Sequence, residues 1–321
     1  MKFNNKSTNR RLFLQMGLSS MAAGLLAACG DVRRLDADDI ATGTGSTTPD
    51  TNDTNDNGNT TTTGPNLGQN AGPQGNWALL SATDAGLTLK SAMHFVSDTR
   101  VYAHLGDQIC YASGPAATDW TAVTDANINL RSGLHVVSDL EIYAVVGEAI
   151  CVSNGIGTGW VDVTGTVAGM GTAFQFINQN IIYAKIGEQV CVYDGINDMW
   201  SAATDNVPVA GAMQDAIHVQ SANKIYAIIG SQICYSNGIG TGWQPLTTDV
   251  AGMGSEFHFV SENEIYARVG DQICVWDGTA WFPFTTNGPA GELQDAFAVF
   301  RNGRVYACLG QNICYYEEPT A

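Results

Sequence analysis

Four histidines recur at one position of a repeated sequence, and imidazole side chains in such a pattern could bind a metal ion or transfer protons. Each stands eight residues before a Tyr-Ala pair, at His94, His135, His218 and His258. Two further copies of the repeat hold Gln175 and Ala298 at this position, and no carboxylate accompanies the histidines at a fixed spacing. Two interpretations remain open. One is a polar or metal-binding collar; the other, favoured by the missing members, is a set of histidines hydrogen-bonded between repeats.

Six cysteines recur with the same period, and a ring of thiolates would offer metal binding or redox chemistry. They are Cys110, Cys151, Cys191, Cys234, Cys274 and Cys314. If Gly106 and Asp107 form a two-residue turn, Ala103 lies opposite Cys110, and the same count pairs an alanine with the cysteine of every copy. We therefore expect a shallow face of small, buried residues that packs against bulky side chains of the adjacent repeat. Equivalent cysteines should lie too far apart for disulfides.

Both sets recur with a sequence motif that occurs six times, about forty residues apart. The cysteine ends the motif, and the histidine precedes it. The motif consists of an aliphatic residue, Tyr-Ala, any residue, a second aliphatic residue, Gly, two further residues, Ile or Val, and finally Cys. Its six copies begin at Val101, Ile142, Ile182, Ile225, Ile265 and Val305. In the fifth copy, four β-rich runs alternate with turns, at 257–260, 264–269, 272–276 and 281–284. Short strands at this period are typical of propeller blades. The sequence therefore predicts an all-β fold, a six-bladed β-propeller of four-stranded antiparallel blades.

The two ends of the repeat region predict how the ring closes. Trp77 begins an additional strand before the first repeat, whereas the last repeat stops at its third strand, near Tyr315. The N-terminal strand can therefore complete the sixth blade, which would leave no free sheet edge.

An eight-residue turn segment, Ser-Asn-Gly-Ile-Gly-Thr-Gly-Trp, occurs twice without change, at 153–160 and 236–243. It resembles the Asp box, Ser-x-Asp-x-Gly-x-x-Trp, of sialidase-like and lectin-like propellers, although Gly155 and Gly238 stand at the aspartate position. The resemblance covers the repeat region, from about residue 76 to the end of the chain. In that family the box is a structural turn, so the resemblance implies a fold and no activity.

The same resemblance raises glycoside hydrolysis as an alternative function. Sialidase-like enzymes use an arginine cluster, a Tyr–Glu nucleophile pair and an acidic proton donor. No arginine of the repeat region stands in a pattern that matches such a cluster; these residues are Arg100, Arg131, Arg268, Arg301 and Arg304. Aspartates recur after the Trp-containing run, a turn position, at Asp84, Asp125, Asp205 and Asp249. The sequence therefore gives no catalytic residue and favours a protein without enzyme activity.

The beginning of the chain indicates export and lipid attachment. Arg10 and Arg11 lie in a segment that resembles the twin-arginine export signal, and a short apolar stretch follows. The stretch ends in Leu-Ala-Ala-Cys at Cys29, which resembles a bacterial lipobox and implies lipidation of Cys29. The residues after it are mostly Thr, Asn, Asp and Gly, too polar to form a core. We predict a signal peptide over 1–28, a lipidated tether over 29–75 and the propeller over 76–321.

Composition limits the choice of partners. The 321-residue chain carries a net charge of −17, and charged residues make up 14% of it. Because an acidic surface repels phosphates, nucleic acid is excluded as a partner. The sequence favours a non-catalytic binding or scaffolding protein without a cofactor, lipid-anchored to a membrane of the bacterial cell envelope, that binds a glycan or an envelope protein. A sialidase-like hydrolase or a metal- or cofactor-binding periplasmic protein is the alternative.

Overall fold

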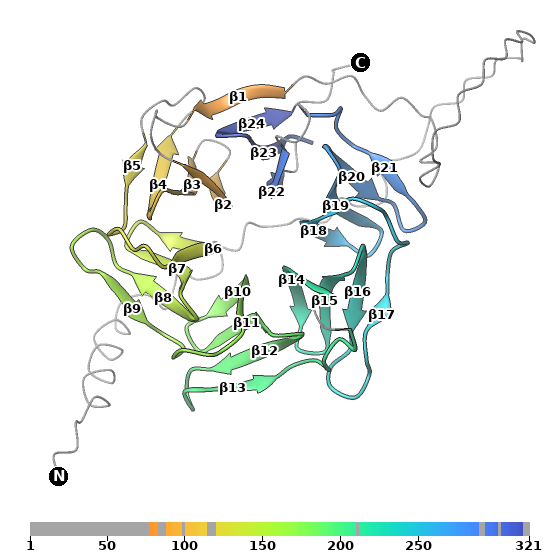
Figure 1. Cartoon of the computed structure of the whole chain (residues 1–321), viewed down its shortest axis with the longest axis horizontal. Helices are drawn as coiled ribbons and strands as arrows, with labels where there is room; N and C mark the ends of the chain where they lie inside the picture. Colours follow the sequence, from red (N-terminus) through yellow and green to blue (C-terminus); the bar gives the residue numbers. More distant parts are fainter. Residues whose placement is uncertain are drawn as a thin grey trace, which may run out of the picture. The chain divides into compact units, whose positions relative to one another are not determined.

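Six four-stranded antiparallel sheets form a ring in the computed structural model of this chain (Figure 1). The structure describes residues 77–82, 88–97, 100–113, 120–209, 212–288, 293–300 and 303–316. They all belong to one compact unit. Within the described ranges, no helix is long and apolar enough to cross a membrane. The predicted six-bladed, all-β propeller is confirmed, whereas Arg10, Arg11 and Cys29 lie outside the described residues.

Each blade is a meander of four strands, numbered here from the centre of the ring outward. The innermost strands are β2 (Leu89–Ser97), β6 (Leu130–Ser138), β10 (Met170–Asn178), β14 (Met213–Ser221), β18 (Met253–Ser261) and β22 (Leu293–Val299). The second strands, which carry the Tyr-Ala pairs, are β3 (Arg100–Leu105), β7 (Glu141–Val146), β11 (Ile181–Ile186), β15 (Lys224–Ile229), β19 (Glu264–Val269) and β23 (Val305–Leu309).

The outer half of each blade carries the cysteines and then a short edge strand. The third strands are β4 (Gln108–Ser113), β8 (Ala149–Ser153), β12 (Gln189–Asp194), β16 (Gln232–Ser236), β20 (Gln272–Trp276) and β24 (Asn312–Tyr316). The outermost strands are β5 (Thr121–Ala122), β9 (Trp160–Asp162), β13 (Met199–Ala202), β17 (Gln244–Pro245), β21 (Trp281–Pro283) and β1 (Trp77–Ala82).

The N-terminal strand closes the ring, as the sequence predicted. β1 pairs antiparallel with β24, so the sixth sheet has the order β1-β24-β23-β22. Trp77 lies opposite Tyr316, and the centres of their rings are 5.4 Å apart. The last blade is thus built from both ends of the propeller, and its third strand does not form a free edge.

The innermost strands are longer than the sequence pattern indicated. β18 begins at Met253 and not at Phe257, because Gly254, Ser255 and Glu256 continue the strand. These residue types are typical of turns, which explains the late predicted start. The register shifts between Met253 and Phe257, a β-bulge or irregularity that also occurs in the innermost pair of the other five blades.

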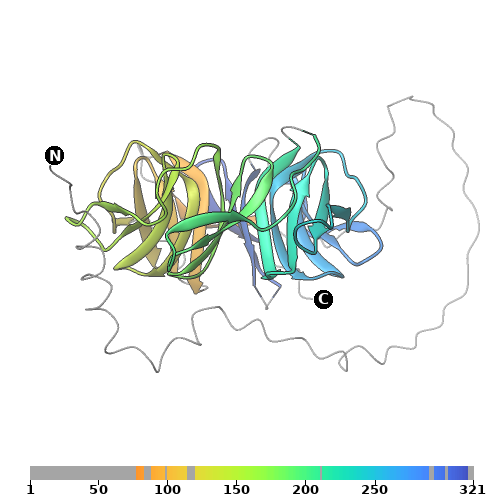
Figure 2. The same ribbon diagram turned by 90° about the horizontal axis from the view of Figure 1, so that it is seen from below.

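Neighbouring blades nest through a tyrosine on one side and an alanine on the other. Tyr102 of the first blade lies in one buried cluster with Ala144 of the second, and both side chains are almost inaccessible. The same combination closes the circle, because Tyr306 of the last blade lies in one cluster with Ala103 of the first. The sheets stand side by side around the ring with these clusters between them (Figure 2). Shape complementarity of a bulky face and a shallow face holds the blades together.

A second repeated contact, not foreseen from the sequence, links the third strand to the segment leaving each blade. The hydroxyl of a buried threonine accepts a hydrogen bond from a backbone amide of the third strand. Thr124 accepts from Ile109 at 3.0 Å in the first blade. The equivalent threonines are Thr164, Thr204, Thr247 and Thr285. These residues satisfy backbone donors that would otherwise be buried without a partner.

Candidate functional site

The repeat cysteines lie in the packing between strands and not in an open site. Cys110 stands opposite Ala103, and an alanine faces the repeat cysteine in each of the other five blades, which is the register predicted from the sequence. All are free thiols, and only Cys314 is more than slightly accessible. Burial raises the pKa of the Cys110 thiol to about 11 and that of Cys151 to about 12. Thiols in this state are poor nucleophiles and poor metal ligands.

The four repeat histidines occupy the innermost strands. His94 and His135 come from adjacent blades, and the centres of their rings are 5.1 Å apart. His135 also stacks on Phe176, and His218 stacks on Phe259 of the next blade. Burial lowers the pKa of His94 to about 3, with the neighbouring His135 adding to the shift, and burial lowers the pKa of His258 to about 4. The imidazoles are therefore neutral at physiological pH and pack against aromatic rings between blades.

No carboxylate or thiol joins these histidines in the part of the chain that the structure describes. A search of the described residues finds no group of three or more His, Cys, Asp or Glu side chains that could hold a metal ion. His104, which lies outside the repeated set, is fully buried. His135 and His218 contact the next blade by ring stacking, which differs from the hydrogen bonding between repeats that the sequence suggested.

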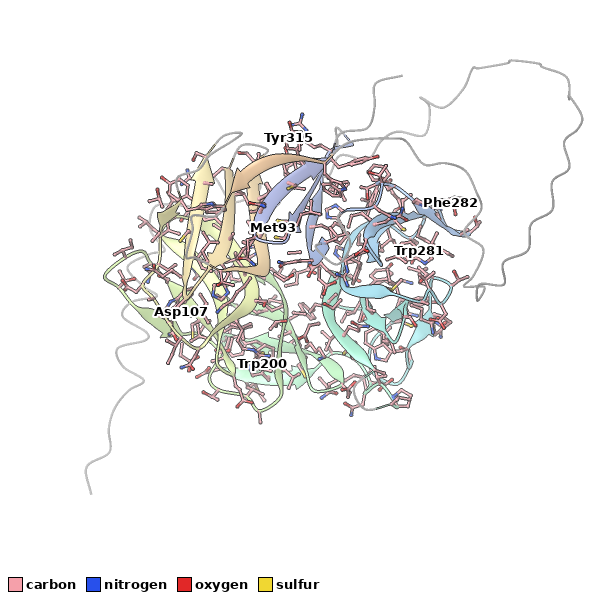
Figure 3. The ribbon with its side chains drawn as sticks, turned by 45° about the horizontal axis from the view of Figure 1, so that its top comes forward. Met93, Asp107, Trp200, Trp281, Phe282 and Tyr315 are labelled. Atoms are coloured by element: carbon pink, nitrogen blue, oxygen red, sulfur yellow. The ribbon has the colours of Figure 1, made fainter. Side chains whose placement is uncertain are left out.

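A cavity of about 360 Å³ lies among the innermost strands and is lined by residues of all six. Three carboxylates line it, Asp215 from β14, Glu256 from β18 and Asp295 from β22. Figure 3 shows Met93, another lining residue, close to the centre of the ring, whereas Trp200 and Tyr315 lie nearer its circumference. We call this cavity the channel cavity.

Two of the three carboxylates are paired with a cation from the preceding blade. Lys185 Nζ lies 3.0 Å from Asp215 Oδ1, and Arg268 Nε lies 3.1 Å from Asp295 Oδ1. Thr172 Oγ1 donates to Asp215 at 3.0 Å, and Ser255 Oγ donates to Asp295 at 2.8 Å. Burial opposes ionisation of Asp215, but the bonds from Lys185 and Thr172 outweigh it and lower its pKa. These pairs fasten the third blade to the fourth and the fifth to the sixth.

Tyrosine–carboxylate pairs are present, but none of them has the properties of a catalytic nucleophile. Tyr143 donates to Glu141 at 2.8 Å, and Tyr266 donates to Glu264 at 2.9 Å, in two different blades. Tyr226 of the fourth blade donates to Glu262 of the fifth blade at 2.9 Å. Burial, with the adjacent glutamate, raises the pKa of Tyr143 and of Tyr226. A nucleophilic phenol needs the opposite shift, so these pairs give no support to a sialidase-like reaction.

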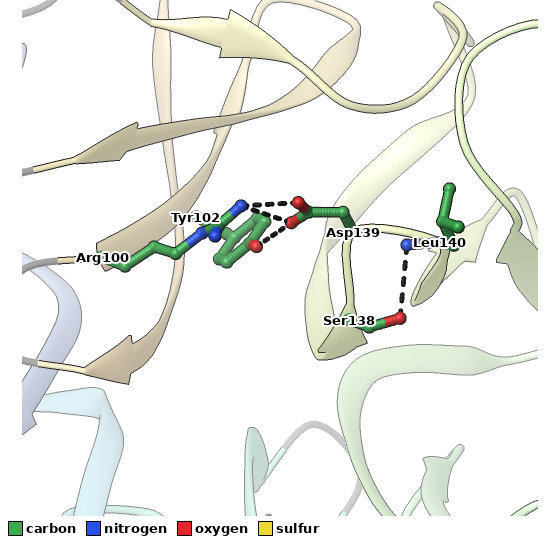
Figure 4. A network of polar contacts seen from close by, with 5 residues as sticks. All are labelled: Arg100, Tyr102, Ser138, Asp139 and Leu140. Atoms are coloured by element: carbon green, nitrogen blue, oxygen red, sulfur yellow. Dashed lines mark hydrogen bonds and ion pairs between the residues drawn. The ribbon is translucent and has the colours of Figure 1, made fainter.

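A further polar network ties the first blade to the second (Figure 4). Arg100 contacts both carboxylate oxygens of Asp139 at 2.6 Å, and Tyr102 donates to the same carboxylate. The Arg100 guanidinium also lies over the ring of Tyr111, 4.5 Å from its centre. Burial and the bond to Asp139 raise the pKa of Tyr102 to about 12. Lys224 stacks on Tyr235 and Arg304 stacks on Tyr315 in the same way.

The repeated turn segment is held by a carboxylate of the preceding blade, which the sequence did not reveal. Asp125 accepts hydrogen bonds from the backbone amides of Gly157 at 2.8 Å and Gly159 at 2.7 Å. Asp205 accepts in the same way from Gly240 and Gly242, at 2.9 Å and 2.8 Å. The sequence placed both aspartates in a turn. The only signal of their second role was that the identical octapeptides follow them at similar distances.

Tryptophans in or next to the outermost strands also form hydrogen bonds between neighbouring blades. Trp160 Nε1 donates to the carbonyl of Asp125 at 3.1 Å, and Trp243 Nε1 donates to that of Asp205 at 3.0 Å. Trp200 donates to the carbonyl of Thr164 at 3.3 Å. Trp281 is buried, with 2% of its surface exposed. The indoles of Trp160, Trp200 and Trp243 thus link neighbouring blades.

Exposed aliphatic side chains gather on blades one to three, where the innermost strands end and turn into the second strands. Val96, Val137 and Ile177 occupy equivalent positions of β2, β6 and β10, and Leu140 and Ile181 follow in or just after the turns. Leu140 exposes 67% of its surface and Val96 exposes 54%. We call these five residues the apolar arc. Single exposed aliphatic residues are common, whereas equivalent ones on three successive blades form a continuous feature.

The apolar arc does not continue around the ring. In the fourth blade its equivalent position holds Gln220, an exposed polar residue, in the fifth the partly buried Val260, and in the sixth Phe300. Phe300 is partly buried because it packs edge-on against Phe95 and Tyr306. At this one position, blades one to three present an exposed aliphatic side chain and blades four to six do not.

Sequence comparison finds no matching protein-family model and no matching curated protein. Comparison of structures finds propellers. The WD40 propeller domain of Doa1 is similar with a TM-score of 0.51 and 11% identity, over 76% of this chain and 98% of that one. A gluconolactonase-like protein is similar with a TM-score of 0.55 and 11% identity, over 76% of this chain and 92% of that one. At this identity the likeness shows the propeller fold alone.

Proposed function

We propose that this protein is a non-catalytic binding or scaffolding propeller that holds a protein partner through the apolar arc. The observation that carries the proposal is the asymmetric exposure of Val96, Val137, Leu140, Ile177 and Ile181 on three successive blades. Exposed aliphatic side chains at consecutive equivalent positions are typical of protein–protein contact surfaces. Propellers are rigid rings that present many loops, which suits them to this use.

Charge defines the partner further. The whole chain carries a net charge of −17. A partner surface that combines apolar side chains with lysine or arginine would complement this face and approach it faster. The acidic net charge disfavours an anionic lipid surface as the occupant of the arc.

The envelope location is part of the same proposal. The segment that contains Arg10 and Arg11 and the lipobox-like sequence at Cys29 support export and lipid anchoring. A Cys29→Ala variant should remain unprocessed or be released from the membrane fraction, which cell fractionation and intact mass would reveal. Unchanged fractionation together with unchanged mass would contradict the anchor while leaving the binding proposal intact.

The binding proposal is tested with a matched pair of variants. Leu140→Ser/Ile177→Ser changes the arc, whereas Ile128→Ser/Ile239→Ser changes two aliphatic residues that are exposed elsewhere. Proteins retained from an envelope extract are identified, purified and titrated against each variant by calorimetry. We expect one basic partner that binds the wild type and the control but loses at least tenfold in affinity for the arc variant. Equal affinity for both variants, or retention of a glycan alone, would refute the proposal.

A further inference from the structure

One residue of the channel cavity departs from its five equivalents. The position ten residues before the repeat tyrosine lies in the innermost strand, and it holds a small side chain in five blades and Glu256 in the fifth blade. The five small residues are Ala92, Gly133, Ala173, Ala216 and Ala296. Repetition therefore explains alanine or glycine here, and it does not explain a glutamate. The exception places a carboxyl group at a position where the other blades have only a methyl group or a hydrogen atom.

The Glu256 carboxylate has no hydrogen-bond or ion-pair partner among the described residues. Its side chain is partly buried and lines the channel cavity of about 360 Å³. Asp295 and Asp215, which also line the cavity, act on it electrostatically, and both are already paired, with Arg268 and Lys185. A carboxylate in such surroundings is costly unless a cation compensates it. Enclosure by protein, with the two aspartates, raises the pKa of Glu256 to about 8.

The remaining lining defines what kind of cation would fit. The cavity presents the hydroxyls of Ser91, Ser132 and Thr172 and the apolar side chains of Met93, Phe174 and Phe297. The described residues provide no group of three metal-binding side chains, so the donor set is unlike that of a metal site. Hydroxyl acceptors, one carboxylate and apolar walls suit a group that donates several hydrogen bonds and carries a short hydrocarbon chain. A primary ammonium has three such donors.

We propose that the channel cavity binds a small alkylammonium ion, whose ammonium group pairs with Glu256 and donates to neighbouring hydroxyls while its hydrocarbon chain contacts the apolar lining. The volume is within the range of small-molecule sites. Binding is coupled to deprotonation of Glu256, because the cation pairs with the charged form only. Affinity therefore rises with pH up to about 8 and falls about tenfold for each pH unit below it.

The experiment is calorimetry on the full chain with n-butylammonium chloride, and it uses butan-1-ol, sodium butyrate and calcium chloride as comparison ligands. Glu256→Gln removes the charge with almost no change of shape. The matched control, Glu264→Gln, alters a glutamate that bonds to Tyr266 and does not line the cavity. Thermal melts establish that both variants fold.

We expect n-butylammonium to bind the wild type and Glu264→Gln, with proton release, and butan-1-ol and butyrate not to bind. Glu256→Gln should lose at least tenfold in affinity and lose the proton release. Three results would overturn the proposal: no n-butylammonium binding at pH 8.5, unchanged binding by Glu256→Gln, or calcium binding that depends on Glu256 without any binding of the amine. If Glu256→Gln fails to fold, the pH dependence and proton release of the wild type alone decide the matter.

Discussion

Asp125 of the first blade accepts a hydrogen bond of 2.8 Å from the backbone amide of Gly157 in the second blade. Gly157 has a positive φ of 85°, so the turn that offers this amide adopts a backbone that glycine favours. The aspartate thus stabilises a glycine-rich turn across a blade junction, where an Asp box would use a residue of its own. Asp205 repeats the arrangement with Gly240 two blades further on.

This relationship predicts an acid-sensitive junction. The amides of Gly157 and Gly159 lower the pKa of Asp125, and those of Gly240 and Gly242 lower the pKa of Asp205. A depressed pKa means that the stabilisation is present above the unfolded-state pKa, near 4, and is lost as pH falls through the lower folded-state value. Asp125→Asn/Asp205→Asn should therefore have a lower Tm than the wild type at pH 7.

The difference in Tm should narrow as pH falls below the unfolded-state pKa near 4, because the wild-type carboxylates progressively gain protons. Calorimetric scans at pH 7 and pH 3 measure both values. Asp194→Asn serves as the control, since Asp194 accepts its bonds within its own turn and not across a junction. A Tm difference that stays constant from pH 7 to pH 3 would contradict the charge-based explanation.

The buried threonines predict a loss of stability that is larger than that of the aspartate variants and does not depend on pH. Thr124 is fully buried, and its hydroxyl satisfies the amide of Ile109. Thr124→Val keeps the shape but leaves this amide without a partner, which should lower the free energy of unfolding by about 1–3 kcal/mol. Thr121→Val, at an exposed position of β5, should change it by less than about 0.5 kcal/mol. Urea unfolding monitored by tryptophan fluorescence distinguishes the two, and equal midpoints would show that the buried hydroxyl is dispensable.

The sequence predicted the features that recur with the blade period. The Tyr-Ala and Cys positions, the number of blades and closure by the Trp77 strand could all be predicted, because each is expressed in the spacing of a single repeat. Contacts between blades could not be predicted in this way. Asp125 and Gly157 are separated by 32 residues and belong to different copies, so no pattern within one repeat connects them.

The candidate sites were missed for a related reason. Glu256 differs from its equivalents only when all six innermost strands are aligned through the irregular stretch after Met253, and turn-like composition hid the strand there. The apolar arc consists of ordinary strand residues, and only their accessibility in the ring distinguishes Val96 or Ile177 from buried neighbours. Positions that deviate from the repeat therefore carry the functional information, whereas the repeat itself specifies the fold.

Ring closure gives a direct test of the fold. Deleting residues 77–82 removes β1 and exposes the edge of β24, together with the partner of Tyr316. We expect a large loss of Tm, or aggregation through the open edge. Deleting the six residues 50–55, which precede the propeller unit, should leave the Tm unchanged. Similar melting of the two deletion variants would show that β1 contributes little to the closed ring.

The repeat thiols should be inert in the folded protein. Cys151, Cys234 and Cys274 are buried, and burial raises their pKa to about 11 or 12, so the reactive thiolate is rare at pH 8. Peptide mass spectrometry after brief alkylation should show little modification of these residues before denaturation and complete modification afterwards. Cys314, the most accessible of the repeat cysteines, should react first. Rapid native labelling of Cys151 or Cys274 would contradict the packing described above.

The neutral histidines predict a loss of stability in mildly acidic solution, in a pH range above that of the aspartates. Burial lowers the folded-state pKa of His94 to about 3 and of His135 to about 4, although Glu141 partly opposes the second shift. Between pH 6.5 and pH 4 the unfolded chain therefore binds more protons than the folded chain, and the free energy of unfolding falls as pH falls. His94→Gln/His135→Gln removes two of these groups, and glutamine already occupies the equivalent position at Gln175. Urea unfolding at pH 7.5 and pH 5 should show a smaller pH dependence for this variant than for the wild type, because fewer buried groups must gain a proton on unfolding. Equal pH dependence would mean that these imidazoles are charged, or accessible to water, in the folded ring.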